Sequence, residues 1–163
     1  SRHAGKLQHA LMFRQVLLEH QGVLQLPGVP TRGAAVFKKQ CANCHKLDDV
    51  GHDIGPNLRS LTDKKPGSLL ASILDPSASV DGKYVTYIAL TDDGRSYSGM
   101  IASETGNSLT LVEQANKQHV LLRTQLEEIR STGKSLMPDG LEKDLTHQDF
   151  ADLLAYLRAK DLK

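Results

Sequence analysis

The stretch QCANCHK, residues 40–46, carries the clearest chemical signal in the chain. Cys41 and Cys44 stand three positions apart and are its only two cysteines, and His45 follows the second directly. Two thiols and an imidazole at this spacing fit a metal site, a redox-active thiol pair, or the attachment of a haem. Each chemistry needs different partners elsewhere in the chain.

The metal and thiol-pair interpretations are the weaker two. A zinc site needs four ligands, so it would have to recruit a second histidine, with His52, His119 and His147 as candidates. A thioredoxin-type pair is expected after a strand, at the start of a helix, inside a βαβ pattern. Here the pair instead follows a helical pattern, RGAAVFKKQ.

Covalent haem c, with its iron, explains the motif best. Each thiol adds to one vinyl group of the porphyrin, and the two-residue spacer sets the reach between them. His45 is then carried beneath the ring plane as an axial ligand. This interpretation requires a partner for the other nitrogen of the His45 ring, a second axial position, and apolar walls.

Composition bounds the remaining possibilities. The chain has 163 residues, with 39% hydrophobic and 24% charged residues, which is typical of one globular domain. Only 4% of residues are aromatic and Trp is absent, so the core needs aliphatic side chains or a group that is not protein. The net charge of +1 gives no case for nucleic acid or an anionic membrane as partner. No apolar stretch approaches the roughly 18 residues of a membrane span.

Because the chain does not begin with Met, we expect a mature product or an excised fragment.

Hydrophobic periodicity predicts helices around the motif. Residues 6–19 form an amphipathic pattern with Leu7, Leu11 and Leu18 along one side, and GVLQLPGVP follows as a linker. Thr31 is a candidate cap for a second helix that runs into the cysteine motif. Residues 47–61 predict a long ordered loop and residues 66–74 a short helix.

The residue pattern changes after the short helix. Residues 84 to about 130 contain alternating β-branched and apolar runs separated by turn-like DDGR, TGN and ANK, which predicts a small antiparallel β unit. A final helix is expected from about 147 to 160. Thr146 and Asp149 resemble a capping box at its start, and its inward face is predicted to consist of Phe150, Leu153, Leu154 and Leu157.

The loop after the cysteine motif resembles that of class I c-type cytochromes through the run Gly55-Pro56-Asn57-Leu58. The resemblance implies that the Pro56 carbonyl accepts a hydrogen bond from His45 and that Leu58 packs on the haem. Arg59 is expected to reach a propionate.

The second axial ligand in this family is usually Met. Met137, next to Pro138 in a loop before the last helix, resembles the distal ligand loop. Met12 and Met100 are the other methionines, and a strand Met is usually core filling. The alternatives are the same three histidines considered above for zinc, in a bis-histidine site.

Two flanking helices also resemble those of class I cytochromes. RGAAVFKKQCANCH matches the N-terminal helix, and DLLAYLRAK matches the C-terminal helix. Because a glycine at a helix crossing lets a ring approach the backbone, we expect Gly33 to contact Tyr156.

Residues 31–160 as a whole resemble a narrower group, the haem-binding domain family of Planctomycetes and Verrucomicrobia. DPSASV, the β unit and SLMPDGLEKDLTHQDFADLLAYL carry this resemblance. It implies a mainly α class I cytochrome c fold over residues 31–163, with a β insertion at about 81–130, so α+β overall. Residues 1–30 would be the tail of a preceding region.

The implied function is electron transfer, with no enzymatic step of its own. The donor would be a redox partner protein or a fused dehydrogenase domain of a larger oxidoreductase. Covalent haem assembly implies a periplasmic or otherwise extracytoplasmic location. Two alternatives remain open: a gas or redox sensor with a labile Met137, and a binding module whose β unit docks a partner or pairs two copies as a homodimer.

Overall fold

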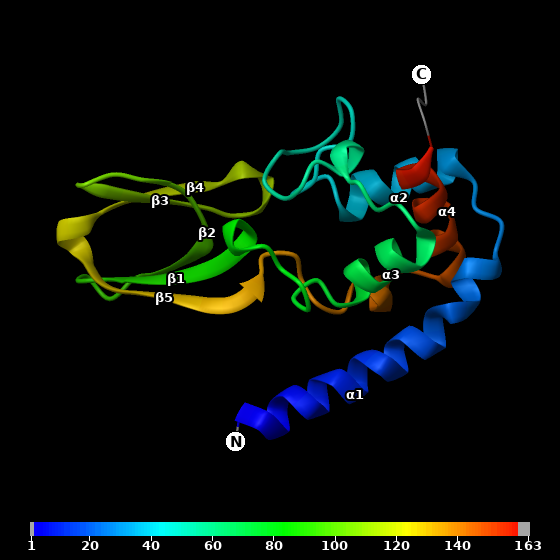
Figure 1. Cartoon of the computed structure of the whole chain (residues 1–163). Coiled ribbons are helices and arrows are strands. Elements are labelled where there is room, and N and C mark those ends of the chain that lie inside the picture. Colours follow the sequence, from blue (N-terminus) through cyan, green and yellow to red (C-terminus); the bar gives the residue numbers. More distant parts are fainter. Residues whose placement is uncertain (1, 160–163) are drawn as a thin grey trace.

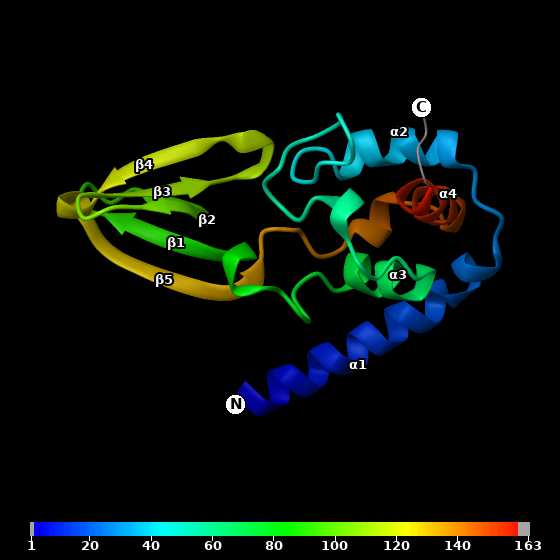
Figure 2. The same ribbon diagram turned by 45° about the horizontal axis from the view of Figure 1, so that its top comes forward.

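The computed structural model describes residues 2–159, which form a group of helices at one end and a curled five-stranded sheet at the other (Figures 1 and 2). The α-helices are α1 (Arg2–His20), α2 (Pro30–Gln40), α3 (Pro66–Leu74) and α4 (His147–Arg158). The strands are β1 (Val85–Thr91), β2 (Ser96–Glu104), β3 (Ser108–Val112), β4 (Gln118–Leu122) and β5 (Leu126–Ser135). Among the helices of the described part, none is both long and apolar enough to cross a membrane.

Helices α2 and α4 cross at a point where their backbones nearly touch. A Cβ atom added at Gly33 would lie 2.0 Å from the carbonyl oxygen of Asp152 and 2.8 Å from the Cβ of Tyr156. The predicted contact between Gly33 and Tyr156 is therefore confirmed. The Phe37 ring packs on the same Tyr156, with ring centroids 5.7 Å apart. This crossing fixes the helix that ends in the cysteine motif.

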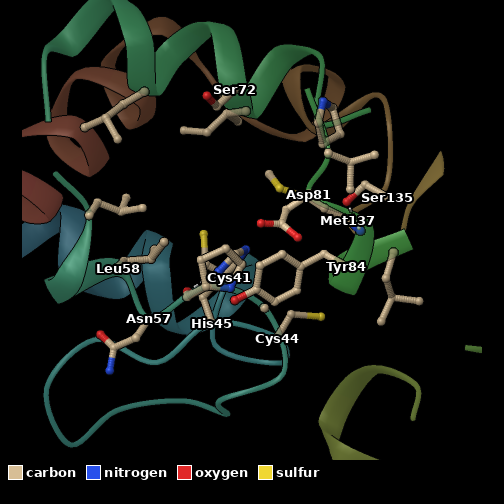
Figure 3. Close-up of a pocket in the computed structure, with 18 of the residues that line it drawn as sticks. Cys41, Cys44, His45, Asn57, Leu58, Ser72, Asp81, Tyr84, Ser135 and Met137 are labelled. Atoms are coloured by element: carbon tan, nitrogen blue, oxygen red, sulfur yellow. Dashed lines mark hydrogen bonds between the residues drawn. The ribbon is translucent and has the colours of Figure 1, made fainter. Parts of the chain in front are cut away.

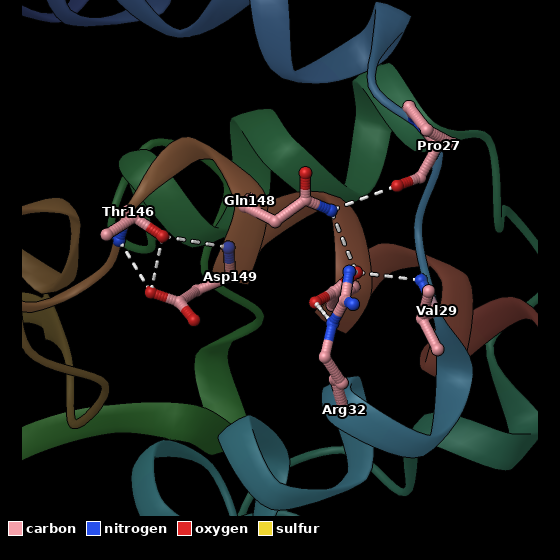
Figure 4. A network of polar contacts seen from close by, with 7 residues as sticks. Pro27, Val29, Arg32, Thr146, Gln148 and Asp149 are labelled. Atoms are coloured by element: carbon pink, nitrogen blue, oxygen red, sulfur yellow. Dashed lines mark hydrogen bonds and ion pairs between the residues drawn. The ribbon is translucent and has the colours of Figure 1, made fainter.

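A buried carboxylate ties the start of α2 to α4 (Figure 4). Asp152, 2% exposed, accepts hydrogen bonds from the Val29 N–H at 2.7 Å, from Arg32 Nε at 2.6 Å and from Gln148 Nε2 at 2.9 Å. The expectation that Thr31 caps this helix is wrong. Pro30 already occupies the first turn, where its missing N–H costs nothing, and Val29 is the N-cap.

The predictions for α4 are confirmed. The Thr146 hydroxyl accepts a hydrogen bond from the Asp149 N–H at 3.1 Å, and the Asp149 carboxylate accepts one from the Thr146 N–H at 2.8 Å. The helix ends at Arg158, two residues earlier than expected. Its predicted inward face is buried in the main core, at Phe150, Leu153, Leu154 and Leu157.

Helix α1 packs through a different face from the one that we predicted. Leu7, Leu11 and Leu18 are 65%, 59% and 56% exposed. The side chains that contact the core are Phe13, Val16 and Leu17. The leucine periodicity identified the helix, but the geometry of the neighbouring helices decided which stripe is covered.

The sheet is antiparallel throughout, with the order β4-β3-β2-β1-β5. Its own small core is formed by Ala89, Leu109, Leu111 and Leu121. The predicted β unit is confirmed in type, but β5 extends to Ser135, beyond the expected end near residue 130. This extension brings the sheet directly to the loop that carries Met137.

Candidate functional site: a cavity around the cysteine motif

The loop after α2 folds back on the cysteine motif through backbone hydrogen bonds. The carbonyl oxygen of Cys44 accepts from the N–H groups of Ile54 at 3.1 Å and Gly55 at 2.7 Å. The Leu58 N–H donates to the Lys46 carbonyl at 2.9 Å. These bonds bring residues 54–58 back alongside His45.

The ring of His45 is oriented by a single hydrogen bond. Its Nδ1 lies 2.9 Å from the carbonyl oxygen of Pro56. Because a carbonyl only accepts, Nδ1 carries the proton and Nε2 has a free lone pair. Burial lowers the pKa of His45, and the bond to the Pro56 carbonyl opposes this effect. A neutral imidazole is the form that binds a metal.

Gly55 leaves the space that this ring occupies. A Cβ atom at position 55 would lie 2.8 Å from Cε1 and 3.0 Å from Nδ1 of His45. Only a residue without a side chain lets the loop pass so close to the imidazole.

The two thiols and His45 line one cavity of about 620 Å³ (Figure 3). Apolar side chains from the loop, from α3 and from α4 contribute to its walls, among them Leu58, Leu61, Leu69, Ile73 and Leu157. A cavity of this size is in the range that holds a cofactor. A covalent haem needs two thiols, an imidazole with a free nitrogen and apolar walls, and this cavity has all three.

Both thiols are held in the protonated form. Burial raises the pKa of Cys41 to about 12, and the neighbouring Cys44 adds to the shift. Burial also raises the pKa of Cys44. Both cysteines are free thiols. They are therefore poorly suited to reactions as exposed thiolates.

Met137 also lines the cavity, as does Met100 from β2. In Figure 3, Met137 enters from the side of Ser135 and Tyr84, apart from the side on which His45 and Cys41 lie. Met12 is 62% exposed on α1 and lies outside the cavity wall.

The three alternative histidines lie elsewhere in the fold. His119 contacts Glu113 at 2.8 Å and the Tyr97 ring at 4.9 Å, within the sheet. His147 packs against His20, with ring centroids 5.0 Å apart. His52 is exposed in the loop. None of the three lines the cavity.

The side chain of Arg59, for which we expect a propionate contact, binds within its own loop and at the end of α4. Its guanidinium binds the Asp48 carboxylate, with Nε at 2.8 Å from Oδ1, and its Nη1 donates to the Ala159 carbonyl at 2.7 Å. Arg59 is not among the residues that line the cavity. These contacts join the loop to the end of α4.

Sequence reasoning missed several cavity residues that come from distant elements. Tyr84 precedes β1 and Met100 lies in β2, and both reach the cavity from the sheet. Met100 is 5% exposed and forms a small buried cluster with Ile54 and Val112. Nothing in a strand pattern distinguishes a methionine at such a junction from one in an ordinary core.

Comparisons with known proteins point to one family. A family model described as cytochrome c matches residues 30–89. Cytochrome c of Theileria annulata is 30% identical over 137 residues, which cover 83% of this chain and 90% of that protein. Cytochrome c of Sesamum indicum is 29% identical over 133 residues, with 81% and 90% covered. Cytochrome c of Ulva intestinalis is 42% identical over 43 residues, so the match spans 26% of this chain and 39% of the relative.

Proposed function

Because this chain belongs to the cytochrome c family, we propose that it is a class I electron-transfer domain with one covalent haem and with His45 and Met137 as axial ligands. Proteins of this family bind haem c with its iron and are generally electron carriers rather than enzymes. When bound, the haem supplies one-electron chemistry through its iron. In this function no side chain acts as an acid, a base or a nucleophile during turnover.

The observation that carries the proposal is the placement of His45 beside both cysteines in one cavity, oriented by Pro56. Each S–H bond of Cys41 and Cys44 would add across one vinyl C=C bond, so a C–S bond and a C–H bond form and no atom leaves. The bond between His45 Nδ1 and the Pro56 carbonyl holds the ring and leaves Nε2 for the iron.

Met137 is the proposed second ligand. A thioether ligand raises the reduction potential, and the aliphatic walls exclude water, which also favours the reduced state. Two observations support this role: Met137 lines the cavity, and it enters apart from the His45 side.

The test is spectroscopic and uses two matched variants. The full chain is expressed with haem maturation, and we expect haem that stays attached on a denaturing gel and a reduced spectrum with an α band. Met137→Ala should abolish the near-infrared methionine–iron band. Met100→Leu, which removes the other thioether of the same cavity but keeps a side chain of similar volume in its buried cluster, should retain it.

Three outcomes would each contradict a different part of this proposal. A chain without covalent haem would reject the cytochrome function. A band that survives in Met137→Ala but vanishes in Met100→Leu would reject only the ligand assignment. Rapid and complete binding of carbon monoxide to the reduced protein would favour the sensor alternative, because a firmly bound distal ligand blocks exogenous ones.

We further propose residues 31–163 as the cytochrome domain, with residues 1–30 as the tail of a preceding region. The family match ends at residue 89, inside β1, which supports the sheet as an insertion. This arrangement supports membership of the haem-binding domain family of Planctomycetes and Verrucomicrobia. The electron donor would be a partner or fused dehydrogenase in an extracytoplasmic compartment.

A homodimer through the β unit is the remaining proposal about partners. The edge strand β4 carries Val120 and Leu122, which are 67% and 48% exposed. Such an edge is able to pair with a second copy. Sedimentation of the haem-loaded chain at several concentrations tests this, with Val120→Lys expected to favour the monomer.

A further inference from the structure

The inserted sheet ends at the cavity. The last pair of the ladder between β1 and β5 is Val85 with Ser135. Tyr84 directly precedes Val85, and Leu136 and Met137 directly follow Ser135. All three line the cavity, and Figure 3 shows Tyr84 and Met137 there. The proposed ligand, Met137, therefore lies two residues after the end of β5, the last strand of the insertion.

Ser135 fastens the start of the methionine loop. Its hydroxyl oxygen accepts a hydrogen bond from the Met137 N–H at 3.1 Å. Its own N–H donates to the hydroxyl oxygen of Ser77 at 3.2 Å, from the segment that follows α3. Ser135 is thus held by the sheet and by the helical part, and it holds the backbone of Met137 in turn.

The end of β5 is braced before it reaches Ser135. A bulge separates the pairs Val85–Ser135 and Tyr87–Ser131. Within the bulge, the Thr132 hydroxyl donates to the Thr86 carbonyl at 2.9 Å and accepts from the Lys134 N–H at 3.1 Å. These bonds keep the bulged segment attached to β1 where regular pairing is interrupted.

The same sheet is fastened to the cysteine motif. The Ala115 N–H, in the turn between β3 and β4, donates to the Asn43 carbonyl at 2.8 Å. Ala115 and its neighbour Asn116 adopt left-handed backbone conformations, with φ of 55° and 59°. Strained turns persist where the surroundings hold them and they often mark functional positions. Here the strained turn presents a donor to the spacer between Cys41 and Cys44.

We propose that the inserted sheet is the frame that fixes Met137 relative to His45, with Ser135 as the positioning residue. One rigid unit contacts the cysteine motif through Ala115 and carries the methionine loop through Ser135. The buried cluster of Ile54, Met100 and Val112 packs the sheet against the loop that follows the cysteine motif. The sheet thereby determines how readily the distal ligand leaves. This inference rests on the proposed ligation by Met137.

The decisive variant is Ser135→Ala in the haem-loaded full chain. Loss of the bond to the Met137 N–H frees the loop, so the rate of carbon monoxide binding to the reduced protein should rise roughly fivefold, the factor that one ordinary hydrogen bond represents. The near-infrared band should weaken and the reduction potential should fall. Ser135→Thr keeps the hydroxyl and should restore all three readouts toward wild type.

Ser131→Ala is the matched control. The Ser131 hydroxyl oxygen accepts from the Gly133 N–H at 3.1 Å, the same local bond four residues earlier in the same strand, on an exposed side chain. This variant should leave the spectrum and carbon monoxide binding unchanged. Wild-type behaviour of Ser135→Ala, or equal effects of both variants, would overturn the proposal while the ligand assignment stands. A band that survives in Met137→Ala would overturn the ligand assignment and this inference together.

Discussion

Gly33 and Asp152 meet backbone to backbone where α2 crosses α4, so closely that a Cβ atom on residue 33 would lie 2.0 Å from the Asp152 carbonyl oxygen. The helix that delivers Cys41 and Cys44 is therefore positioned by a contact that only glycine permits. The geometry of the cavity depends on this crossing, because α2 ends directly before the cysteine motif.

Gly33→Ala should force the two helices apart. We expect the free energy of unfolding of the haem-loaded chain to fall by at least about 2 kcal/mol, since overpacking against backbone has no flexible side chain to yield. Denaturant unfolding followed in the haem absorption measures this. Gly22→Ala, at a position with no atom within 4 Å of the added Cβ, should change it by less than about 0.5 kcal/mol. Similar losses in both variants would contradict the role of the crossing.

Gly55→Ala should disturb the orientation of His45. The added Cβ would lie 2.8 Å from Cε1 of the ring, so either the ring or the loop must move and the bond to Pro56 weakens. We expect a shifted reduction potential and a loss of at least about 1 kcal/mol in stability. Gly67→Ala, whose Cβ would meet only Leu24 at 3.9 Å, should keep the wild-type potential. An unchanged potential in Gly55→Ala would remove the argument for steric orientation.

The carboxylate of Asp152 should make the fold sensitive to acid. The hydrogen bond from Arg32 is the largest cause that lowers the pKa of Asp152 to about 2, from an ordinary 3.8. The unfolded chain takes up this proton more readily than the folded one, so the stabilisation is present above pH 3.8 and is lost as pH falls toward about 2.

Asp152→Asn should lower the free energy of unfolding at pH 7 by on the order of 2 kcal/mol, the usual worth of hydrogen bonds to a charged group. Its stability should also depend less on pH between 3.8 and about 2 than that of the wild type. Urea unfolding at several pH values measures both. Asp92→Asn, at an exposed position, is the control and should retain the wild-type acid slope. Parallel slopes for all three proteins would contradict the assignment.

Ala115→Gly should stabilise the chain, which is unusual for this substitution. The φ of 55° at Ala115 is costly for a residue with a Cβ and free for glycine, while the N–H that binds Asn43 is kept. We expect a gain of up to about 1 kcal/mol after the added flexibility of the unfolded chain is subtracted. Ala10→Gly, at an exposed position inside α1, should instead lose about 0.5–1 kcal/mol. The opposite signs distinguish relief of strain from a general effect of glycine.

The sequence alone determined the chemistry of the site wherever residues that are close in sequence are also close in space. Cys41, Cys44 and His45 lie within five residues, and Pro56 follows in a loop short enough for backbone bonds to return it to the histidine. The Thr146 capping box and the helical periodicities have the same origin, because they involve contacts within about four residues. For these features, residue type and spacing determine the structure.

Only the tertiary structure decided which distant residues share the cavity and which helix faces are covered. Tyr84 and Ser135 reach the site because the pairing of β1 with β5 ends there, and Met100 reaches it from β2. Arg59 binds Ala159 at the end of α4 as well as Asp48 in its own loop. The leucine stripe of α1 faces outward because the neighbouring elements cover Phe13, Val16 and Leu17 instead. Such contacts depend on how whole helices and strands pack against one another. The spacing of residues along the chain does not determine that packing.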